Sequence, residues 1–225
     1  MEDTTAGPLE EAETARTPVP AARTPRPPFR TWISKLLLES LLIAFSVFFA
    51  LAVDEWRDNR NALARSDVAL QAIASEIVTN RTALEKARTV HTASLERLQA
   101  AIAAEQPLSA EVAYGGGISQ PASLLATAWI EARNSGAVNQ WPYDLLLDVS
   151  RMYDRQAFYS NLSTQLTVDL YREIRQRGAE PVLRYNNVGF AAIVNDFKNR
   201  EEGLIKSADQ VLARVKARLA ERGVQ

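Results

Sequence analysis

The sequence predicts an all-α protein with one transmembrane helix that continues into a long helix, followed by an antiparallel helical bundle of about four helices. Three observations predict this fold. Residues 36–53 form an apolar run, residues 54–104 contain neither proline nor glycine, and the later segments repeat apolar side chains at spacings of three and four. Such spacings place apolar side chains on one face of a helix, which must then pack against other helices.

The apolar run reads LLLESLLIAFSVFFALAV at residues 36–53. At about 1.5 Å per residue it covers most of a hydrocarbon core of about 30 Å. Trp32 and Trp56 flank the run at the two expected interfaces, and Lys35 can extend toward the head groups. We expect three regions: a disordered, proline-rich tail (1–31), a membrane anchor (32–56) and a helical bundle (57–225). The anchor residues singled out are Trp32, Lys35, Glu39 and Trp56.

Glu39 lies one turn inside the apolar run, where an ionised carboxylate is costly. One interpretation is an ion pair with Lys35, four residues earlier, close to the membrane surface. The other is an intramembrane contact between Glu39 and another helix, because acidic residues are rare inside membrane spans.

The charges on the two sides of the run predict its orientation. Acids accompany the arginines that follow the run, whereas the basic residues before it have no acid among them. The positive-inside rule therefore predicts a cytoplasmic N-terminus and an extracytoplasmic, periplasmic bundle on the inner membrane of a bacterium. The basic residues before the run are Arg16, Arg23, Arg26, Arg30 and Lys35.

A cleaved signal peptide is the alternative to an anchor, because Ala50 and Ala52 form an A-x-A-like site after an apolar run. Against this alternative, the segment before the run is long for an n-region, and the residues after Ala52 continue as helix formers. A mature protein beginning at Val53 would support cleavage.

The composition argues against several classes of function. The net charge is −1 with acids and bases interspersed, so we expect no nucleic-acid partner. The chain has no cysteine and one histidine, so we expect no metal site, cofactor or catalytic residues, and no enzymatic activity. Several charged pairs have the spacing of a solvated helix face: Glu131 with Arg133, Asp148 with Arg151, Asp154 with Arg155, and Glu201 with Glu202.

Residues 54–104 predict one long amphipathic helix with an imperfect coiled-coil repeat. Apolar residues and His91 recur every seven positions, at Leu63, Leu70, Ile77, Leu84, His91 and Leu98. Polar residues at other seam positions, including Ser66 and Asn80, favour a bundle over a two-stranded coiled coil. His91 is interpreted as a polar group that one neighbour satisfies in the core, with a pH sensor as the alternative.

Three further helices follow a connector that contains three consecutive glycines at 115–117. Pro121 is expected in the first turn of a short helix that has Trp129 in the core and stops at Gly136. Pro142 opens a second helix that reaches Arg177, with a turn from Gly178. A third ends near Gly223, with Gly203 as a weak point midway. The aromatic residues Tyr153, Phe158 and Tyr171 are expected to widen the core face of the second helix.

The most site-like cluster in the sequence lies between the first two of these helices. It combines amides with an aromatic residue, at Asn134, Asn139, Gln140 and Trp141, beside Ser135. One interpretation is a contact site for a partner. The other is a set of capping and packing residues that fixes the corner between two helices.

Two stretches carry a resemblance to a known kind of protein. They are ALAVDEWRDNR at residues 50–60 and TAWIEARNSGAVNQWPYDLLLDVSRMYDRQAFYSN at residues 127–161. In both, the chain resembles uncharacterised bacterial single-pass membrane-anchored proteins, which are described as domains of unknown function. The resemblance implies an anchored helical architecture and supplies no activity.

These observations predict a scaffold or accessory subunit that acts through protein contacts. The expected partners are the lipid bilayer, a membrane or periplasmic protein, and another copy of the chain. The alternative is an extracytoplasmic sensor module in which a ligand or a pH change is reported through a partner.

Overall fold

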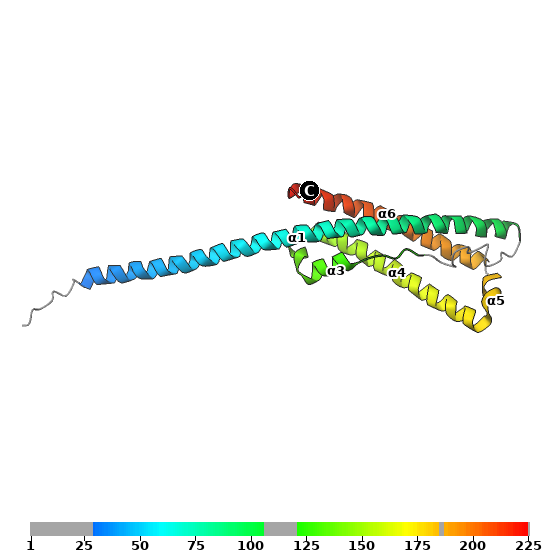
Figure 1. Ribbon diagram of the computed structural model, residues 1–225, viewed down its shortest axis with the longest axis horizontal. Coiled ribbons are helices and arrows are strands. Elements are labelled where there is room, and N and C mark those ends of the chain that lie inside the picture. The colour runs from blue at the N-terminus through cyan, green and yellow to red at the C-terminus, as the bar shows by residue number, and fades with distance from the viewer. Residues whose placement is uncertain (1–28, 106–120, 185–186, 225) are drawn as a thin grey trace, which may run out of the picture. The chain divides into compact units, whose positions relative to one another are not determined.

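The computed structural model describes residues 29–105, 121–184 and 187–224. Within these ranges the regular elements are helices (Figure 1), so the all-α fold class is confirmed. They are α1 (Phe29–Ala103), α3 (Thr127–Asn134), the 3-10 helix η1 (Ala137–Gln140), α4 (Tyr143–Arg177), α5 (Ala179–Arg184) and α6 (Asn187–Glu221). The expected disordered tail and the glycine triplet lie outside the described residues.

The chain divides into two compact units, Met1–Val53 and Asp54–Gln225. In the first unit, every side chain from residue 35 to residue 53 is exposed. This helix is long and apolar enough to cross a membrane. The Ser46 hydroxyl donates to the Leu42 carbonyl at 2.8 Å, which satisfies a polar group within an apolar surface.

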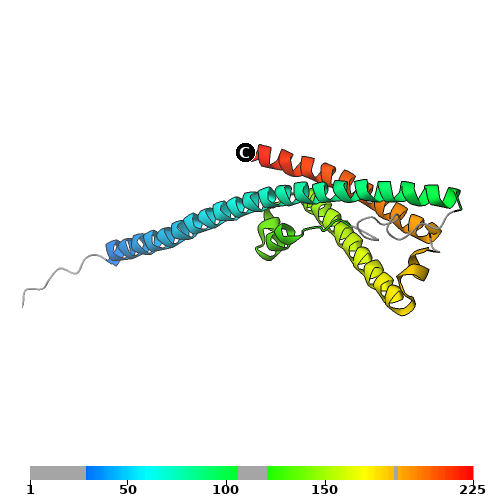
Figure 2. The same ribbon diagram turned by 45° about the vertical axis from the view of Figure 1, so that its right-hand side comes forward.

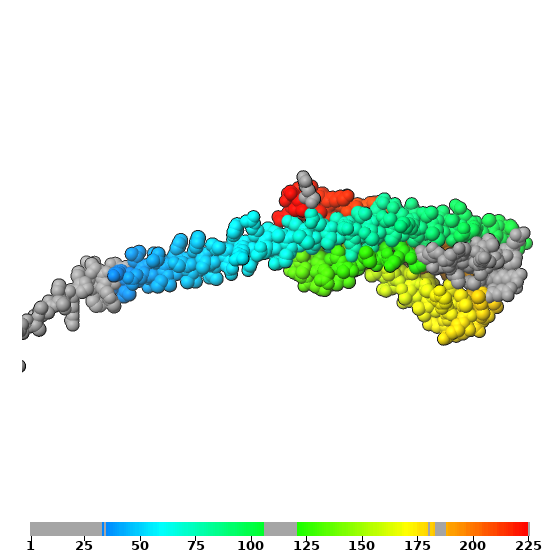
Figure 3. Space-filling view, in the orientation of Figure 1, coloured from blue at the N-terminus to red at the C-terminus, as the bar shows by residue number. Residues whose placement is uncertain are grey.

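In the second unit, the part of α1 from Asp54 onward packs against α4 and α6 (Figures 1 and 2). The space-filling view shows α3 and α6 lying against this part of α1 (Figure 3). Three clusters of buried side chains follow one another along α1, around Ile73, Leu84 and Leu98. The heptad positions predicted from the sequence therefore form the core, apart from Leu63, which is half-buried.

The same clusters give the helix directions. Leu70 shares a cluster with Leu145 and Leu219, whereas Leu98 packs with Leu170 and Phe190. Because these residues come from opposite ends of α4 and α6, α4 runs parallel to this part of α1 and α6 runs antiparallel to both. The expectation that Pro121 opens a helix is wrong, because residues 121–126 are not helical and α3 begins at Thr127.

The expectation of a turn without a helix after Gly178 is wrong, because the short helix α5 occupies Ala179–Arg184. Several other expected boundaries are confirmed. α4 begins directly after Pro142 and ends at Arg177, where Gly178 has φ +84°. Gly136, after α3, has φ +69°, a conformation that side chains with a Cβ rarely adopt. α6 continues through Gly203 without interruption.

The aromatic residues of α4 divide between core and surface. Tyr153 is buried, but Phe158 and Tyr171 are 57% and 68% exposed, so the expectation that all three widen the core face is wrong for two of them. The reason is the rotation of 100° per residue, which keeps only a narrow stripe of a helix against its neighbours. Trp129 is buried in the core, as predicted.

Candidate functional site

The core of the second unit contains several buried polar side chains between its apolar layers. Five of those that the structure describes come from α1: Ser94, and four with partners on other elements, which lie on the same stripe as the core leucines and isoleucines, at Ser66, Glu76, Asn80 and His91. A buried polar group is costly unless a hydrogen bond satisfies it. The partners of these four side chains therefore define the site.

Glu76 links three helices. Its Oε1 accepts a hydrogen bond from the Tyr153 hydroxyl at 2.7 Å, and its Oε2 accepts one from the backbone N–H of Ala128 at 2.9 Å. Ala128 is the second residue of α3, where backbone N–H groups have no partner within the helix. Glu76 thus caps α3 from α1. Burial, followed by the bond to Glu76, raises the pKa of Tyr153 well above its usual value of 10.

Asn80 holds the segment before α3. Its side-chain amide donates to the Leu125 carbonyl at 2.7 Å, and its carbonyl oxygen accepts from the Leu125 N–H at 2.8 Å. The same amide also donates to Oε1 of Gln156 at 3.1 Å. Because one side chain pairs both backbone groups of Leu125, this segment can lie on the bundle without being helical.

The third network joins α1, α4 and α6. Glu201 Oε1 lies 2.9 Å from His91 Nδ1 and accepts a hydrogen bond from the Tyr159 hydroxyl at 2.6 Å. The backbone N–H of Ala122 donates to the same hydroxyl at 3.0 Å. Burial, followed by the bond to Glu201, raises the pKa of Tyr159 well above 10, so the phenol keeps the proton that it donates.

The interpretation of Glu201 as part of a solvated helix face is wrong, because its side chain is 0% exposed. Its neighbour Glu202 is exposed, as that interpretation requires. The sequence carries one signal for this difference: Glu201 lies four residues after Phe197 and three before Leu204, on the apolar stripe of α6.

Two atoms of the third network remain unpaired. Among the described residues, His91 Nε2 and Glu201 Oε2 are buried without a hydrogen-bond partner. The imidazole also stacks on the Phe197 ring, with centroids 5.6 Å apart. The interpretation of His91 as a core group satisfied by one neighbour is therefore correct for Nδ1. The other ring nitrogen, Nε2, has no hydrogen-bond partner among the described residues.

His91 lines a cavity of ≈ 390 Å³ between α1, α4, α5 and α6. Its walls are mostly apolar and come from Leu170, Val182, Phe190, Ile193, Val194 and Phe197, among others. Asp169, Glu173 and Arg177 are exposed at the cavity. Thus an apolar cavity meets one buried polar side chain whose second ring nitrogen has no partner.

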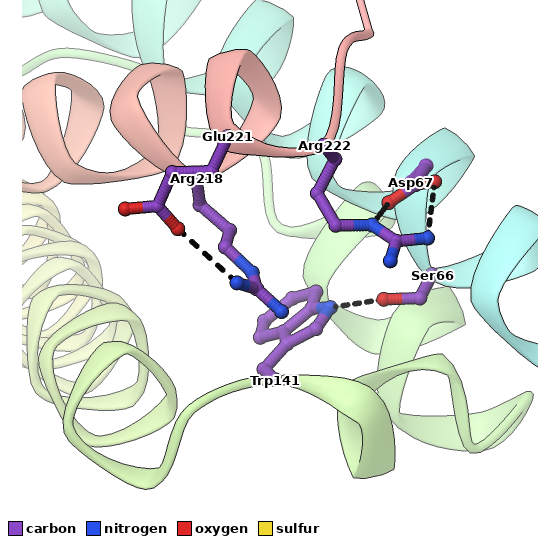
Figure 4. A network of polar contacts seen from close by, with 6 residues as sticks. All are labelled: Ser66, Asp67, Trp141, Arg218, Glu221 and Arg222. Atoms are coloured by element: carbon purple, nitrogen blue, oxygen red, sulfur yellow. Dashed lines mark hydrogen bonds and ion pairs between the residues drawn. The ribbon is translucent and has the colours of Figure 1, made fainter.

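The predicted contact cluster lies at another corner of the unit, where α6 ends beside α1 (Figure 4). Trp141 is buried, and its indole N–H donates to the Ser66 hydroxyl at 3.0 Å. Arg222 makes two hydrogen bonds of 3.0 Å to the Asp67 carboxylate nearby. These contacts support the interpretation of Trp141 as a residue that fixes the corner.

The amides of that cluster lie nearer the surface. Asn134 and Asn139 are exposed and Gln140 is half-buried. The Nδ2 atom of Asn139 is 3.3 Å from where a Cβ at Gly136 would lie. A role for these amides in partner contact stays a prediction.

The predicted anchor residues lie in α1. Lys35 and Glu39 are exposed, and among the described residues no ion pair joins them. Trp56 is 63% exposed, with the Arg60 guanidinium 5.6 Å from its ring centroid. Trp32 belongs to the helix backbone, and its side chain lies outside what the structure describes.

Comparisons with known proteins identify no relative: no family model, curated protein or solved structure matches the chain. The resemblance to anchored proteins of unknown function therefore stays a prediction. Within the described ranges, no group of three His, Asp or Glu side chains is placed to bind a metal. The available chemistry of the site is hydrogen bonding at His91 within an apolar cavity.

Proposed function

We propose that the chain is a single-pass protein of the bacterial inner membrane, with a cytoplasmic N-terminus and a bundle that works as a scaffold or accessory subunit outside the cytoplasm. The observation that carries this proposal is the exposed apolar surface of residues 35–53. Leu37, Ile43 and Phe48 are 66%, 66% and 72% exposed. Water disfavours apolar surface by about 25 cal/mol per Å², so this segment needs a bilayer or another cover.

A signal sequence would have the same length and composition as this anchor. The two differ in whether residues 1–52 stay attached. The mass of the protein isolated from membranes separates them, because cleavage after Ala52 leaves a chain that begins at Val53.

Orientation can be tested with single cysteines, because the natural chain has none. We expect a cysteine at Lys216, in α6, to react with a membrane-impermeant maleimide in intact spheroplasts. A cysteine at Thr17, in the tail, should react only after the membrane is permeabilised. The reverse pattern would contradict a cytoplasmic N-terminus.

Contact with a partner protein is supported by large apolar side chains on the surface of the second unit. Phe158 and Tyr171, on α4, are more than half exposed, and aromatic residues are enriched in protein interfaces. A photo-crosslinking amino acid at either position should capture one defined partner in native membranes. The matched control is Gln210, an exposed polar position on α6. Equal capture from all three positions, or capture from none, would contradict a scaffold that binds through α4.

Glu39 offers a test of contact within the membrane. If Glu39 contacts another helix, including a second copy of this chain, Glu39→Leu should weaken association in a two-helix reporter assay. Ser46→Ala is the control, because the Ser46 hydroxyl is already bonded to its own helix. Unchanged association with Glu39→Leu would exclude the contact.

A sensor module is the second candidate, and the cavity at His91 favours it. In this function, a ligand bound in the unit Asp54–Gln225 changes the accessibility of the cytoplasmic tail through a partner. Ligand-dependent protection of the tail from protease would support sensing. Copurification of one membrane complex regardless of ligand would support scaffolding.

A further inference from the structure

The cavity beside His91 has the features of a binding site for a small molecule. Its volume is ≈ 390 Å³. For comparison, an apolar protein cavity of about 150 Å³ accepts benzene. Apolar residues from α4, α5 and α6 make up most of the wall. Of the polar lining residues, Thr167 is half-buried, and Asp169, Glu173 and Arg177 are exposed. The space therefore suits an apolar molecule of two or three rings, or an aliphatic molecule of similar volume.

The hydrogen-bond chain at Glu201 ends on the oxygen that faces Nδ1 of His91. The Ala122 N–H occupies a lone pair of the Tyr159 oxygen, so the phenol proton is directed to Glu201 Oε1. With an ionised Glu201 carboxylate, which can only accept, and a neutral His91, the two states on which this proposal rests, His91 Nδ1 donates its proton to the same oxygen. In the neutral imidazole, Nε2 is then a hydrogen-bond acceptor.

The surroundings of Nε2 point to a ligand that donates a hydrogen bond. His91 is 2% exposed and lines the cavity, and Nε2 has no partner among the described residues. Buried polar atoms are nearly always paired, so this acceptor is an exception that a bound donor would remove.

The charges near the cavity do not favour an anion. Asp169 is paired with Arg172, and the Arg177 Nε lies 3.2 Å from Glu173 Oε2. Arg177, the arginine that lines the cavity in the described part of the chain, is thus engaged by a carboxylate.

We propose that this cavity binds a small, uncharged, mainly apolar molecule whose single hydroxyl or N–H group donates a hydrogen bond to Nε2 of His91. The proposal goes beyond a scaffold function and does not depend on the anchor or its orientation. If the ligand also changes partner binding, this cavity is the input of the sensor module.

The single histidine makes a direct experiment available. The full-length chain is labelled with ¹⁵N-histidine, purified through a tag without histidine and placed in lipid nanodiscs, so that both imidazole nitrogen signals come from His91. The probes are 2-naphthol, with a hydroxyl donor, 2-methoxynaphthalene, with no donor, and 2-naphthoate, an anion. We expect 2-naphthol to shift the Nε2 signal while Nδ1 stays protonated, and to bind about three- to tenfold more tightly than the ether.

Two variants separate binding in the cavity from partition into lipid. Leu170→Trp fills the cavity from α4 and should abolish the shift caused by 2-naphthol, while the Nδ1 signal shows that the pair with Glu201 is intact. Val168→Trp adds the same side chain at an exposed position of α4 and should bind as the natural chain does. The proposal is overturned if the ether binds as tightly as the alcohol, if naphthoate binds most tightly, if Nε2 carries a proton without ligand, or if Leu170→Trp still binds.

Discussion

His91 Nδ1, on α1, lies 2.9 Å from Glu201 Oε1, on α6, and both side chains are buried. This contact joins residues 110 positions apart in the sequence and also includes the Tyr159 hydroxyl from α4. One carboxylate oxygen therefore connects the three long helices of the second unit. Removing it should affect stability far more than removing a surface charge.

Replacing Glu201 by leucine leaves the His91 and Tyr159 donors buried without an acceptor. We expect Glu201→Leu to lower the free energy of unfolding by about 3 to 5 kcal/mol, and Glu201→Gln, which keeps an acceptor oxygen, by about 1 kcal/mol. Denaturant unfolding followed by tryptophan fluorescence measures both. The control is Glu202→Leu at the exposed neighbouring position, which should change stability by less than about 0.5 kcal/mol. Equal changes in the free energy of unfolding at positions 201 and 202 would contradict the assignment of Glu201 to a buried hydrogen-bond network.

The two buried tyrosines predict a loss of stability at alkaline pH. Burial and carboxylate partners raise the pKa values of Tyr153 and Tyr159 in the folded state above 10. Below pH 10 both states hold these protons and the full stability is present. Above pH 10 only the unfolded chain releases them, so the free energy of unfolding falls by about 1.4 kcal/mol per pH unit for each tyrosine.

Single substitutions test this assignment. Tyr153→Phe removes one of the two buried phenol protons. The free energy of unfolding should therefore fall by about 1.4 kcal/mol less per pH unit than in the natural chain. Tyr171→Phe, at a residue 68% exposed, should leave the slope unchanged. Denaturant titrations at several values above pH 10 give the slopes, and identical slopes for both variants would contradict the assignment.

The Asn80 side chain should control the segment before α3. Asn80→Leu removes both bonds to Leu125, and the amide proton of Leu125 should then exchange with solvent at least tenfold faster. Thr79→Ala is the matched control, because the exposed Thr79 hydroxyl bonds only to the Ser75 carbonyl of its own helix. Unchanged exchange in Asn80→Leu would show that other contacts hold this segment.

Two glycines should respond to alanine in opposite directions. Gly203 lies inside α6, and a Cβ there meets no atom within 4 Å, so Gly203→Ala should stabilise the protein by about 0.5 to 1 kcal/mol. Gly136 has φ +69°, and a Cβ there would lie 3.3 Å from Asn139 Nδ2, so Gly136→Ala should destabilise it by about 1 kcal/mol or more. Thermal unfolding measures both changes, and shifts of the same sign would contradict these backbone conformations.

Much of the fold could be predicted because helical periodicity is local information. The seven-residue repeat through Leu70, Ile77 and Leu84 identifies a buried face, and Pro142 and Gly178 mark the ends of α4. The start of α3 could not be predicted in this way. It depends on Glu76 and Asn80, whose partners lie 45 or more residues away and pair with the backbone that a helix from Pro121 would use.

Only part of the candidate site could be predicted from the sequence. His91 was identified from its place on an apolar stripe, but its partner Glu201 was assigned to the surface because it stands beside another glutamate. Two adjacent residues of a helix point about 100° apart, so one can be buried while the next is exposed. The cavity depends on how α4, α5 and α6 diverge around His91, and that geometry depends on contacts between distant residues.

The most direct test of the central claim is alkaline carbonate extraction of washed membranes from cells that make the full-length chain with an N-terminal epitope. A chain anchored through residues 36–53 stays in the membrane pellet, with its epitope still attached. Release of epitope-bearing, full-length protein into the supernatant would contradict the anchor, and with it the orientation and the membrane-bound role proposed for the bundle.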